Sequence, residues 1–378
     1  MEKQRKTGRG SSSRYLNENE APVPDVDKKP AGKYPITNKA GKMNHPKKRR
    51  NNHQTLIAML AVSLHCLTGN AQPFPDPPAA EISNGLVHAK LLLPDAEKGY
   101  YRGTRFDWSG VISEMDYKGH TYFGQWFKKY NPTTNDAIMG PVEAFDPLGY
   151  DSAAPGRYFI KIGIGTLIRD DARPYSPFRY YKILDPGKWA VKKSRERIRF
   201  IHTLDDHAGY AYRYQKEVKL EKGRPVMLLV HTLKNSGTRV IETDVFDHNF
   251  FLLDHLPTAP GLLLKFPFPL RAEEARGLNE IAAIREDSVV ILRSPAAHES
   301  VEAVLYGYGA SEKDYDILLQ NRLSGARVRI SCDRPLSGLV CWGASALLCP
   351  EPYIHISVLP GQTFAWTIKY ELSAESQE

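Results

Sequence analysis

Residues 210–251 read YAYRYQKEVKL-EKGRP-VMLLVHTLKN-SGTRV-IETDVFDHNFF and decide the fold class of this chain. Apolar and polar side chains alternate with a period of two in each of the three longer segments, which is typical of β-strands with one buried face. The run Asn235-Ser236-Gly237 between the second and third segments is a turn signal. These segments are therefore predicted to be three consecutive strands.

The same alternation continues through most of the chain. Further predicted strands cover 85–93, 105–116, 157–165, 197–203, 239–246, 289–293, 302–307, 315–321, 326–332, 353–358 and 364–372. They are rich in Val, Ile, Tyr and Phe and are bounded by Gly, Pro, Asn or Asp. Only residues 272–284 suggest a helix. So many strands in one chain predict an all-β protein, a large antiparallel β-sandwich.

Two long irregular stretches interrupt this pattern, at 128–156 and 169–188. Each contains several prolines among aromatic and apolar residues. Long loops on a β scaffold are usually functional or disordered. Because these two are apolar enough to pack, we expect them to form walls of a binding cleft.

The positive charge of the chain is confined to its N-terminal part. The 378 residues have a formal net charge of +8. Residues 1–71 contain 14 Lys and Arg against 5 Asp and Glu, which leaves 37 basic and 38 acidic residues for 72–378. The body is thus nearly neutral, and the sequence gives no support for binding to nucleic acid.

The N-terminal part has the features of an export signal. A basic run at 47–50 precedes an apolar run at 55–67 that is too short to span a bilayer, and small residues at 69–71 suit cleavage near Ala71. We therefore expect a tail or over-extended start at 1–42, a signal peptide at 43–71, and one mature domain at 72–378 without a membrane span. Periplasmic or secreted localisation follows. A lipoprotein signal at Cys66 and a buried helix at 55–67 are the alternatives.

Three cysteines fall in the predicted mature domain: Cys332, Cys341 and Cys349. An odd number leaves at least one thiol free, and all three lie in apolar strand-like segments where Cys usually packs as a small hydrophobe. Cys332 and Cys341 flank a turn, so a cross-strand disulfide between them is one alternative. The sequence contains no Cys-x-x-Cys or His-Glu-x-x-His motif, so we expect no metal site.

Two residues stand out as candidates for acid–base chemistry. His248 lies among aromatic residues in FDHNFF (246–251), and Glu351 is the single acid of the apolar run LCPEPY (348–353). An acid or base in such surroundings is either half-buried and paired or poised for proton transfer. The two residues are therefore predicted to form a catalytic pair, with a core histidine and an edge-strand carboxylate as the alternatives.

Three motifs in order resemble the aldose 1-epimerase, or galactose mutarotase-like, superfamily. They are the opening segment 103–110 (GTRFDWSG), the Leu-x-Asn-x-Gly hairpin at 233–237 with the strand that carries His248, and the tail CPEP (349–352) with LPG (359–361) and Trp366. The tail is most similar to the glucose-6-phosphate epimerase branch. The resemblance covers roughly 85–372 and implies a carbohydrate ligand, no cofactor, Glu351 as the base at O1 and His248 as the acid at O5 of the sugar.

The chain departs from the family pattern at two positions. By this resemblance, Met139 stands where the family usually has an arginine. An earlier histidine of the family is also absent here, and Lys161 is the cation nearest to its expected position. Glu143 is expected to lie in a loop near the sugar. The predicted substrate-binding residues are Arg105, Trp108, Glu143, Lys161, Asp247 and Tyr175. Arg105 and Lys161 would meet a carboxylated sugar, while Trp108 and Tyr175 would stack on sugar rings.

The sequence therefore predicts first an isomerase that catalyses mutarotation with His248 and Glu351. Two alternatives stay open. A lyase of the same fold would use a cation to neutralise a uronate during β-elimination. A non-catalytic module would bind carbohydrate in the same cleft, and fold alone does not decide between these activities.

Overall fold

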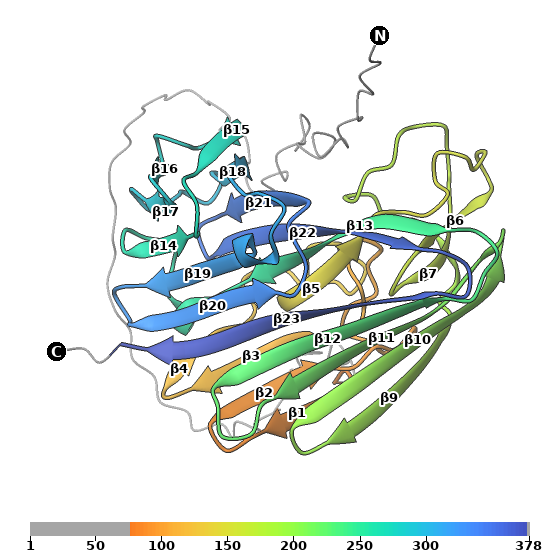
Figure 1. Cartoon of the computed structure of the whole chain (residues 1–378), viewed down its shortest axis with the longest axis horizontal. Coiled ribbons are helices and arrows are strands. Elements are labelled where there is room, and N and C mark those ends of the chain that lie inside the picture. Colours follow the sequence, from red (N-terminus) through yellow and green to blue (C-terminus); the bar gives the residue numbers. More distant parts are fainter. Residues whose placement is uncertain (1–75, 376–378) are drawn as a thin grey trace, which may run out of the picture. The chain divides into compact units, whose positions relative to one another are not determined.

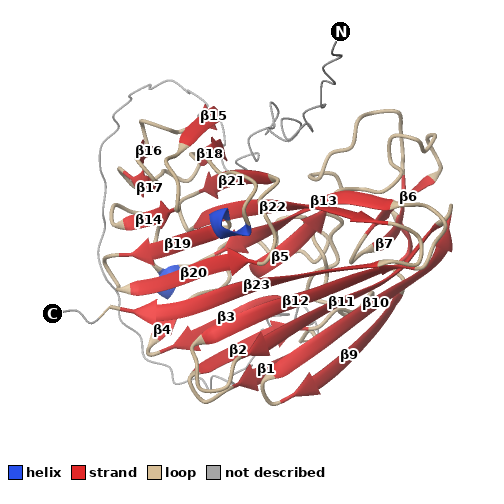
Figure 2. Cartoon of the chain, in the orientation of Figure 1, coloured by secondary structure: helices blue, strands red, loops and turns tan. Residues whose placement is uncertain are grey.

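Almost all regular structure in the described part of the chain is β-strand. The computed structural model describes residues 76–375, apart from the side chain of Glu274. Within this range the only helical segments are two 3-10 turns, Leu253–His255 and Glu312–Asp314 (Figure 2). The predicted tail, signal peptide and cleavage site at 1–71 lie outside the described residues. No helix among the described residues is long and apolar enough to cross a membrane.

The largest sheet has ten strands, and all its neighbours pair antiparallel. The predicted strands 210–220 and 226–235 are neighbours in this sheet, and Lys216 lies opposite His231. In spatial order its strands are β16 (Ala282–Arg285), β17 (Ser288–Ile291), β14 (Leu262–Lys265), β19 (Asp316–Asn321), β20 (Ala326–Cys332), β23 (Thr363–Ala374), β12 (Val226–Asn235), β11 (Tyr210–Leu220), β10 (Arg197–His207) and β9 (Lys188–Ser194) (Figure 1).

A second antiparallel sheet has six strands and carries both His248 and Glu351. Its order is β15 (Arg271–Arg276), β18 (Val301–Tyr306), β21 (Gly338–Gly343), β22 (Leu348–Val358), β13 (Ile241–Phe250) and β5 (Gly140–Phe145). Two smaller sheets complete the unit: β1 (Ala79–Ser83), β2 (Val87–Leu92), β3 (Val111–Tyr117) and β4 (His120–Thr121) form one, and β6 (Tyr158–Lys161), β7 (Gly165–Ile168) and β8 (Ile183–Asp185) form the other.

The main core lies between the ten-stranded and six-stranded sheets. Side chains alternate between the two faces of a strand, so Tyr212, Tyr214 and Val218 of β11 point into this core together with Val245 of β13 and Ile356 of β22. This arrangement of two antiparallel sheets around one core is a β-sandwich. The all-β prediction is confirmed.

A second apolar cluster covers the opposite face of the six-stranded sheet. Val142 and Ala144 of β5, Phe250 of β13 and Cys349 of β22 contribute to it from the sheet. The segment 100–108 and the loops around 126–139 and 175–181 pack against them, through residues such as Phe106 and Tyr181. β5 is therefore covered on both of its faces, which explains why it is buried at every position.

The structure corrects several sequence predictions. Residues 272–284 form no helix but contribute to β15 and β16, because Gly277 turns the chain with a positive φ of 73° between the two strands. The stretches 128–156 and 169–188 are not wholly irregular, since they contain β5 and β8. Residues 105–110 precede β3 and are not a strand.

The three cysteines of the described region are all free and buried. Cys332 lies on β20 of the ten-stranded sheet and Cys341 on β21 of the six-stranded sheet. The alternative of a cross-strand disulfide between them is therefore wrong, because the turn between them leads from one sheet to the other. Burial raises the pKa of each of these two thiols to about 12, so both behave as small core residues.

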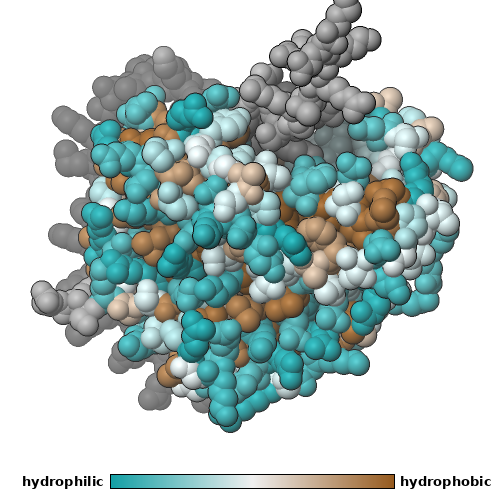
Figure 3. Space-filling model, in the orientation of Figure 1, coloured by the Kyte–Doolittle hydropathy of each residue, from teal (hydrophilic) through white to brown (hydrophobic). Residues whose placement is uncertain are grey.

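The outer face of the large sheet is mostly polar. Figure 3 shows a hydrophilic surface with smaller hydrophobic patches that polar side chains interrupt. β9 illustrates the pattern, because most of its side chains are exposed and several are lysines. An edge strand with exposed lysines resists pairing with another chain.

Candidate functional site

His248 and Glu351 lie in contact on neighbouring strands. β13 pairs with β22 so that Phe246 lies opposite Tyr353, and the chain beyond this pair brings His248 beside Glu351. Their Nε2 and Oε1 atoms are 3.2 Å apart. Both side chains face the second apolar cluster, and the residues are only 3% and 5% exposed. The structure therefore brings together two residues that are about a hundred positions apart in the sequence.

Aromatic rings surround the imidazole of His248. Phe250 stacks on it with ring centroids 3.8 Å apart, while Phe106 and Trp342 meet it edge-on at 5.6 and 5.8 Å. Further rings extend this wall, since Trp126 stacks on Phe250. Trp126 and Trp342 are only partly buried. Partly exposed aromatic faces next to polar groups suit the apolar C–H faces of a sugar ring.

Burial controls the protonation of the pair. Desolvation raises the pKa of Glu351 to about 8, although the charge of Arg105 opposes this shift. Desolvation, helped by the charge of Arg105, lowers the pKa of His248 well below its ordinary value. At neutral pH the carboxyl group therefore keeps its proton and the imidazole is neutral, so the pair has one titratable proton, on Glu351, in addition to the N–H of the neutral imidazole.

Arg105 supplies the positive charge at this site. Its guanidinium group forms an ion pair with Asp136 and lies between the rings of Phe106 and Phe178, at 4.8 and 4.7 Å from their centroids. The Nε atom is buried and has no hydrogen-bond partner among the described residues. Asp136 and Phe178 come from the two stretches that were predicted to wall a cleft.

Arg105 thus places a cation beside the pair, while Met139, which the resemblance predicts at the position of the family arginine, is buried in the second cluster. In the sequence, the resemblance to the family predicted that a cation is missing at Met139. Arg105 was itself predicted to bind the substrate, and the folded chain shows that the segment before β3 carries it to the site.

Four other predicted substrate-binding residues lie in the protein interior with partners of their own. The Trp108 indole donates a hydrogen bond to the Gly103 carbonyl at 2.9 Å. Lys161 donates to the Phe145 carbonyl, and burial lowers the pKa of its amine to about 7. The hydroxyl of Tyr370 donates to Asp247. Asp247 points into the main core because it alternates with His248 along β13.

Glu143 is also enclosed, and the expectation that it lies in a loop is wrong. It sits in the middle of β5, where its carboxylate contacts the amine of Lys216 and accepts from His231 Nε2 at 2.7 Å. The charge of Lys216 holds the pKa of Glu143 below its ordinary value despite burial. This group is a buried ion pair between the two sheets, since all three residues are at most 1% exposed.

Tyr175 is the remaining predicted residue. It is half-buried and stacks on Tyr181 with ring centroids 5.5 Å apart. Of the predicted set, Arg105 is the residue that the structure places beside the His248–Glu351 pair. Phe106, Asp136 and Trp342 were not predicted, and only the aromatic enrichment of 100–108 hinted at the first. Within residues 76–375, no group of three His, Cys, Asp or Glu side chains is arranged to hold a metal ion.

Comparison with known proteins identifies the fold. No protein-family model matches the sequence, and no curated protein matches it. Among solved structures, the chain is similar to the GalM/aldose epimerase homologue from C. elegans, with a TM-score of 0.50 and 13% identity over 79% of this chain and 99% of that one. A galactose mutarotase related enzyme from Lactobacillus acidophilus gives a TM-score of 0.49 and 13% identity, over 80% and 99% of the two chains.

These identities are low enough that the likeness concerns architecture alone. The predicted similarity of the tail to the glucose-6-phosphate epimerase branch stays a prediction. The all-β architecture, the two large antiparallel sheets and the structural likeness to the C. elegans homologue agree with the resemblance seen in the sequence. The chain therefore has the galactose mutarotase-like fold.

Proposed function

We propose that this protein binds a carbohydrate and catalyses aldose 1-epimerase-type mutarotation at the His248–Glu351 pair. The observation that carries the proposal is the contact of 3.2 Å between a carboxyl group and an imidazole beneath partly exposed aromatic rings. O1 and O5 of a pyranose are bonded to the same carbon, so two groups in contact can reach both oxygens. Export to the periplasm or outside the cell belongs to the same proposal and rests on the predicted signal peptide.

The reaction needs one base and one acid. The base takes the proton of the O1 hydroxyl, the C1–O5 bond breaks as C1=O1 forms, and the acid gives its proton to O5. The C1–C2 bond then rotates, and the reverse transfers close the ring on the other face. A pair with one titratable proton shared between a carboxyl group and an imidazole supplies both functions. In the family assignment the base is Glu351 and the acid is His248, which requires the proton to pass from the carboxyl group to the imidazole over their contact.

Arg105 favours this transfer. Its fixed positive charge beside Glu351 stabilises the carboxylate form when the proton leaves. The lyase alternative receives less support from the structure. Asp136 already pairs with Arg105, and Lys161 is enclosed against the Phe145 carbonyl, so neither cation is free to neutralise a uronate.

Proton NMR of freshly dissolved α-sugars with the purified full chain tests the proposal. We expect at least one of galactose, glucose, rhamnose and galacturonate to equilibrate with its β-anomer faster than in buffer alone. The sugar with the largest acceleration identifies the substrate. If none of them is accelerated, the proposal of monosaccharide mutarotation fails, and the non-catalytic module becomes the better description.

The rate should depend on pH through the one titratable proton of the pair. Between about pH 6 and 7.5 Glu351 keeps its proton and His248 is neutral, so kcat/KM should be nearly constant. Above about pH 8 the pair loses this proton and no acid remains for O5, so kcat/KM should fall roughly tenfold per pH unit. Polarimetry with subtraction of the buffer rate measures this, and a rate that keeps rising through pH 9 would contradict the assignment.

A further inference from the structure

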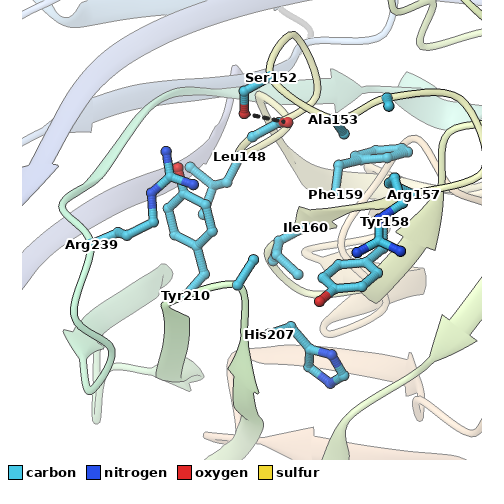
Figure 4. Close-up of a pocket in the computed structure, with 13 residues that line it drawn as sticks. Leu148, Ser152, Ala153, Arg157, Tyr158, Phe159, Ile160, His207, Tyr210 and Arg239 are labelled. Carbon is cyan, nitrogen blue, oxygen red and sulfur yellow. Dashed lines mark hydrogen bonds between the residues drawn. The ribbon is translucent and has the colours of Figure 1, made fainter.

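The protein has a pocket of about 340 Å³ that is lined by neither His248 nor Glu351. Its walls come from three regions: the stretch Leu148–Ala154, the start of β6 with Arg157 and Tyr158, and the hairpin between β10 and β11 with Arg239 beside it (Figure 4). A volume of this size falls in the range of small-molecule sites. The stretch Leu148–Ala154 belongs to one of the two stretches that were predicted to wall a cleft.

The charged groups that line this pocket are positive. Arg157 and Arg239 both line it, and none of its lining residues is an acid. Neither guanidinium group forms an ion pair with any described carboxylate, whereas many arginines elsewhere in residues 76–375 do, such as Arg276 and Arg293. His207 also lines the pocket, but Asp185 accepts its hydrogen bond at 3.1 Å. The two arginines are therefore cations available to an anionic ligand.

Aromatic rings accompany both arginines. Arg239 lies over the ring of Tyr210, with its guanidinium carbon 4.8 Å from the ring centroid, on one side of the pocket. Arg157 lies beside Tyr158 on the other side (Figure 4). The edge of the Tyr158 ring meets His207 at 5.8 Å. A pocket with a cation and a ring on each side suits a ligand that has two negative groups and an apolar face between them.

The backbone beside the pocket is irregular. The register of β10 against β11 shifts between Leu204 and His207, and Ala208 adopts a positive φ of 56°. A bulge re-aims side chains, and a left-handed conformation at a residue other than glycine is strained. Both irregularities lie in the hairpin that contributes His207 and Tyr210 to the pocket.

We propose that this pocket binds a short acidic saccharide, whose carboxylates meet Arg157 at one side and Arg239 at the other. Guanidinium groups recognise carboxylates by charge-assisted, often bidentate hydrogen bonds. The tyrosine rings would lie against the sugar faces. The saccharide part of this inference rests on the proposed carbohydrate function, whereas the anionic part rests on the pocket alone. The site is separate from the catalytic pair, so it would hold a chain or a second ligand rather than the reacting sugar.

Calorimetric titration of the full chain with digalacturonate tests this inference. We expect binding that weakens as salt is added, and a loss of affinity of about tenfold or more in both Arg157→Gln and Arg239→Gln. Arg213→Gln is the matched control, since Arg213 is an exposed arginine of β11 outside the pocket. It should bind digalacturonate like the unchanged protein. Mutarotation should continue in both pocket variants.

Three results would overturn the inference. Equal affinity for galactobiose, the neutral disaccharide, would show that charge is irrelevant. Equal affinity for inorganic phosphate would show a site for small anions and no saccharide. Loss of digalacturonate binding in Glu351→Gln, with both arginine variants unaffected, would place the ligand at the catalytic pair. Failure of mutarotation alone leaves the titration unchanged, so the two proposals fail separately.

Discussion

Replacement of Glu351 by glutamine should abolish most of the acceleration of mutarotation. The amide has nearly the same shape but cannot take or give the proton that the reaction moves, and loss of a positioned acid–base group costs roughly 10²–10⁴-fold in rate. His248 would keep its aromatic surroundings, since Phe250 and Phe106 hold the ring. Proton NMR of the α-to-β conversion, at equal protein concentration, measures the effect.

The same variant should be more stable than the unchanged protein at pH 8. Burial raises the pKa of Glu351 to about 8 in the folded state, whereas its pKa in the unfolded state is near 4.5. The stability that Glu351 contributes is therefore complete below about pH 4.5 and is lost as the pH rises through about 8. Glutamine does not titrate. The free energy of unfolding of Glu351→Gln should therefore exceed that of the unchanged protein by roughly 2–4 kcal/mol at pH 8, and by much less at pH 5.

These two effects together separate catalysis from folding. A variant that loses activity while it gains stability cannot be inactive because it unfolds. Glu242→Gln is the matched control, because Glu242 is an exposed acid on β13 of the same sheet. It should change neither rate nor stability. If Glu351→Gln kept the full rate, Glu351 would have no role in proton transfer.

Replacement of Lys216 by methionine should destabilise the fold by roughly 3–5 kcal/mol. Lys216 is completely buried and contacts the carboxylate of Glu143 between the two sheets. Methionine fills a similar volume, but it leaves the buried charge of Glu143 with His231 as its remaining partner. Asp107, whose pKa burial raises to about 7, would also lose the favourable charge of Lys216. Urea unfolding at pH 7 measures the loss.

A second substitution distinguishes the lost charge from lost packing. Lys216→Met combined with Glu143→Leu removes both charges and should recover a large part of the stability, because a buried pair replaced by apolar residues is often neutral in cost. Lys219→Met provides the control on the same strand. Lys219 faces away from the main core, so the change should cost less than about 0.5 kcal/mol. A single Lys216→Met variant within that range would show that the ion pair contributes little.

The sequence by itself determined the fold class. The period-two alternation in 210–251 becomes β11, β12 and β13 with nearly the predicted bounds, since alternation is a local property that needs only one buried face. It also singled out His248 and Glu351, because a polar group in an apolar strand requires a partner or a function. Charge counts assigned the positive charge to residues 1–71, which lie outside the described structure.

Tertiary structure alone decided which residues share a site. Glu143 and Asp247 resemble site residues in the sequence, yet alternation along β5 and β13 turns both into the main core, where Lys216 and Tyr370 meet them. Arg105 comes to Glu351 from outside the regular strands. The disulfide alternative failed for the same reason, since Cys332 and Cys341 are close in sequence but belong to different sheets. The position of Arg105 and the separation of the two cysteines depend on which distant segments meet in the fold, and a local alternation pattern does not specify this.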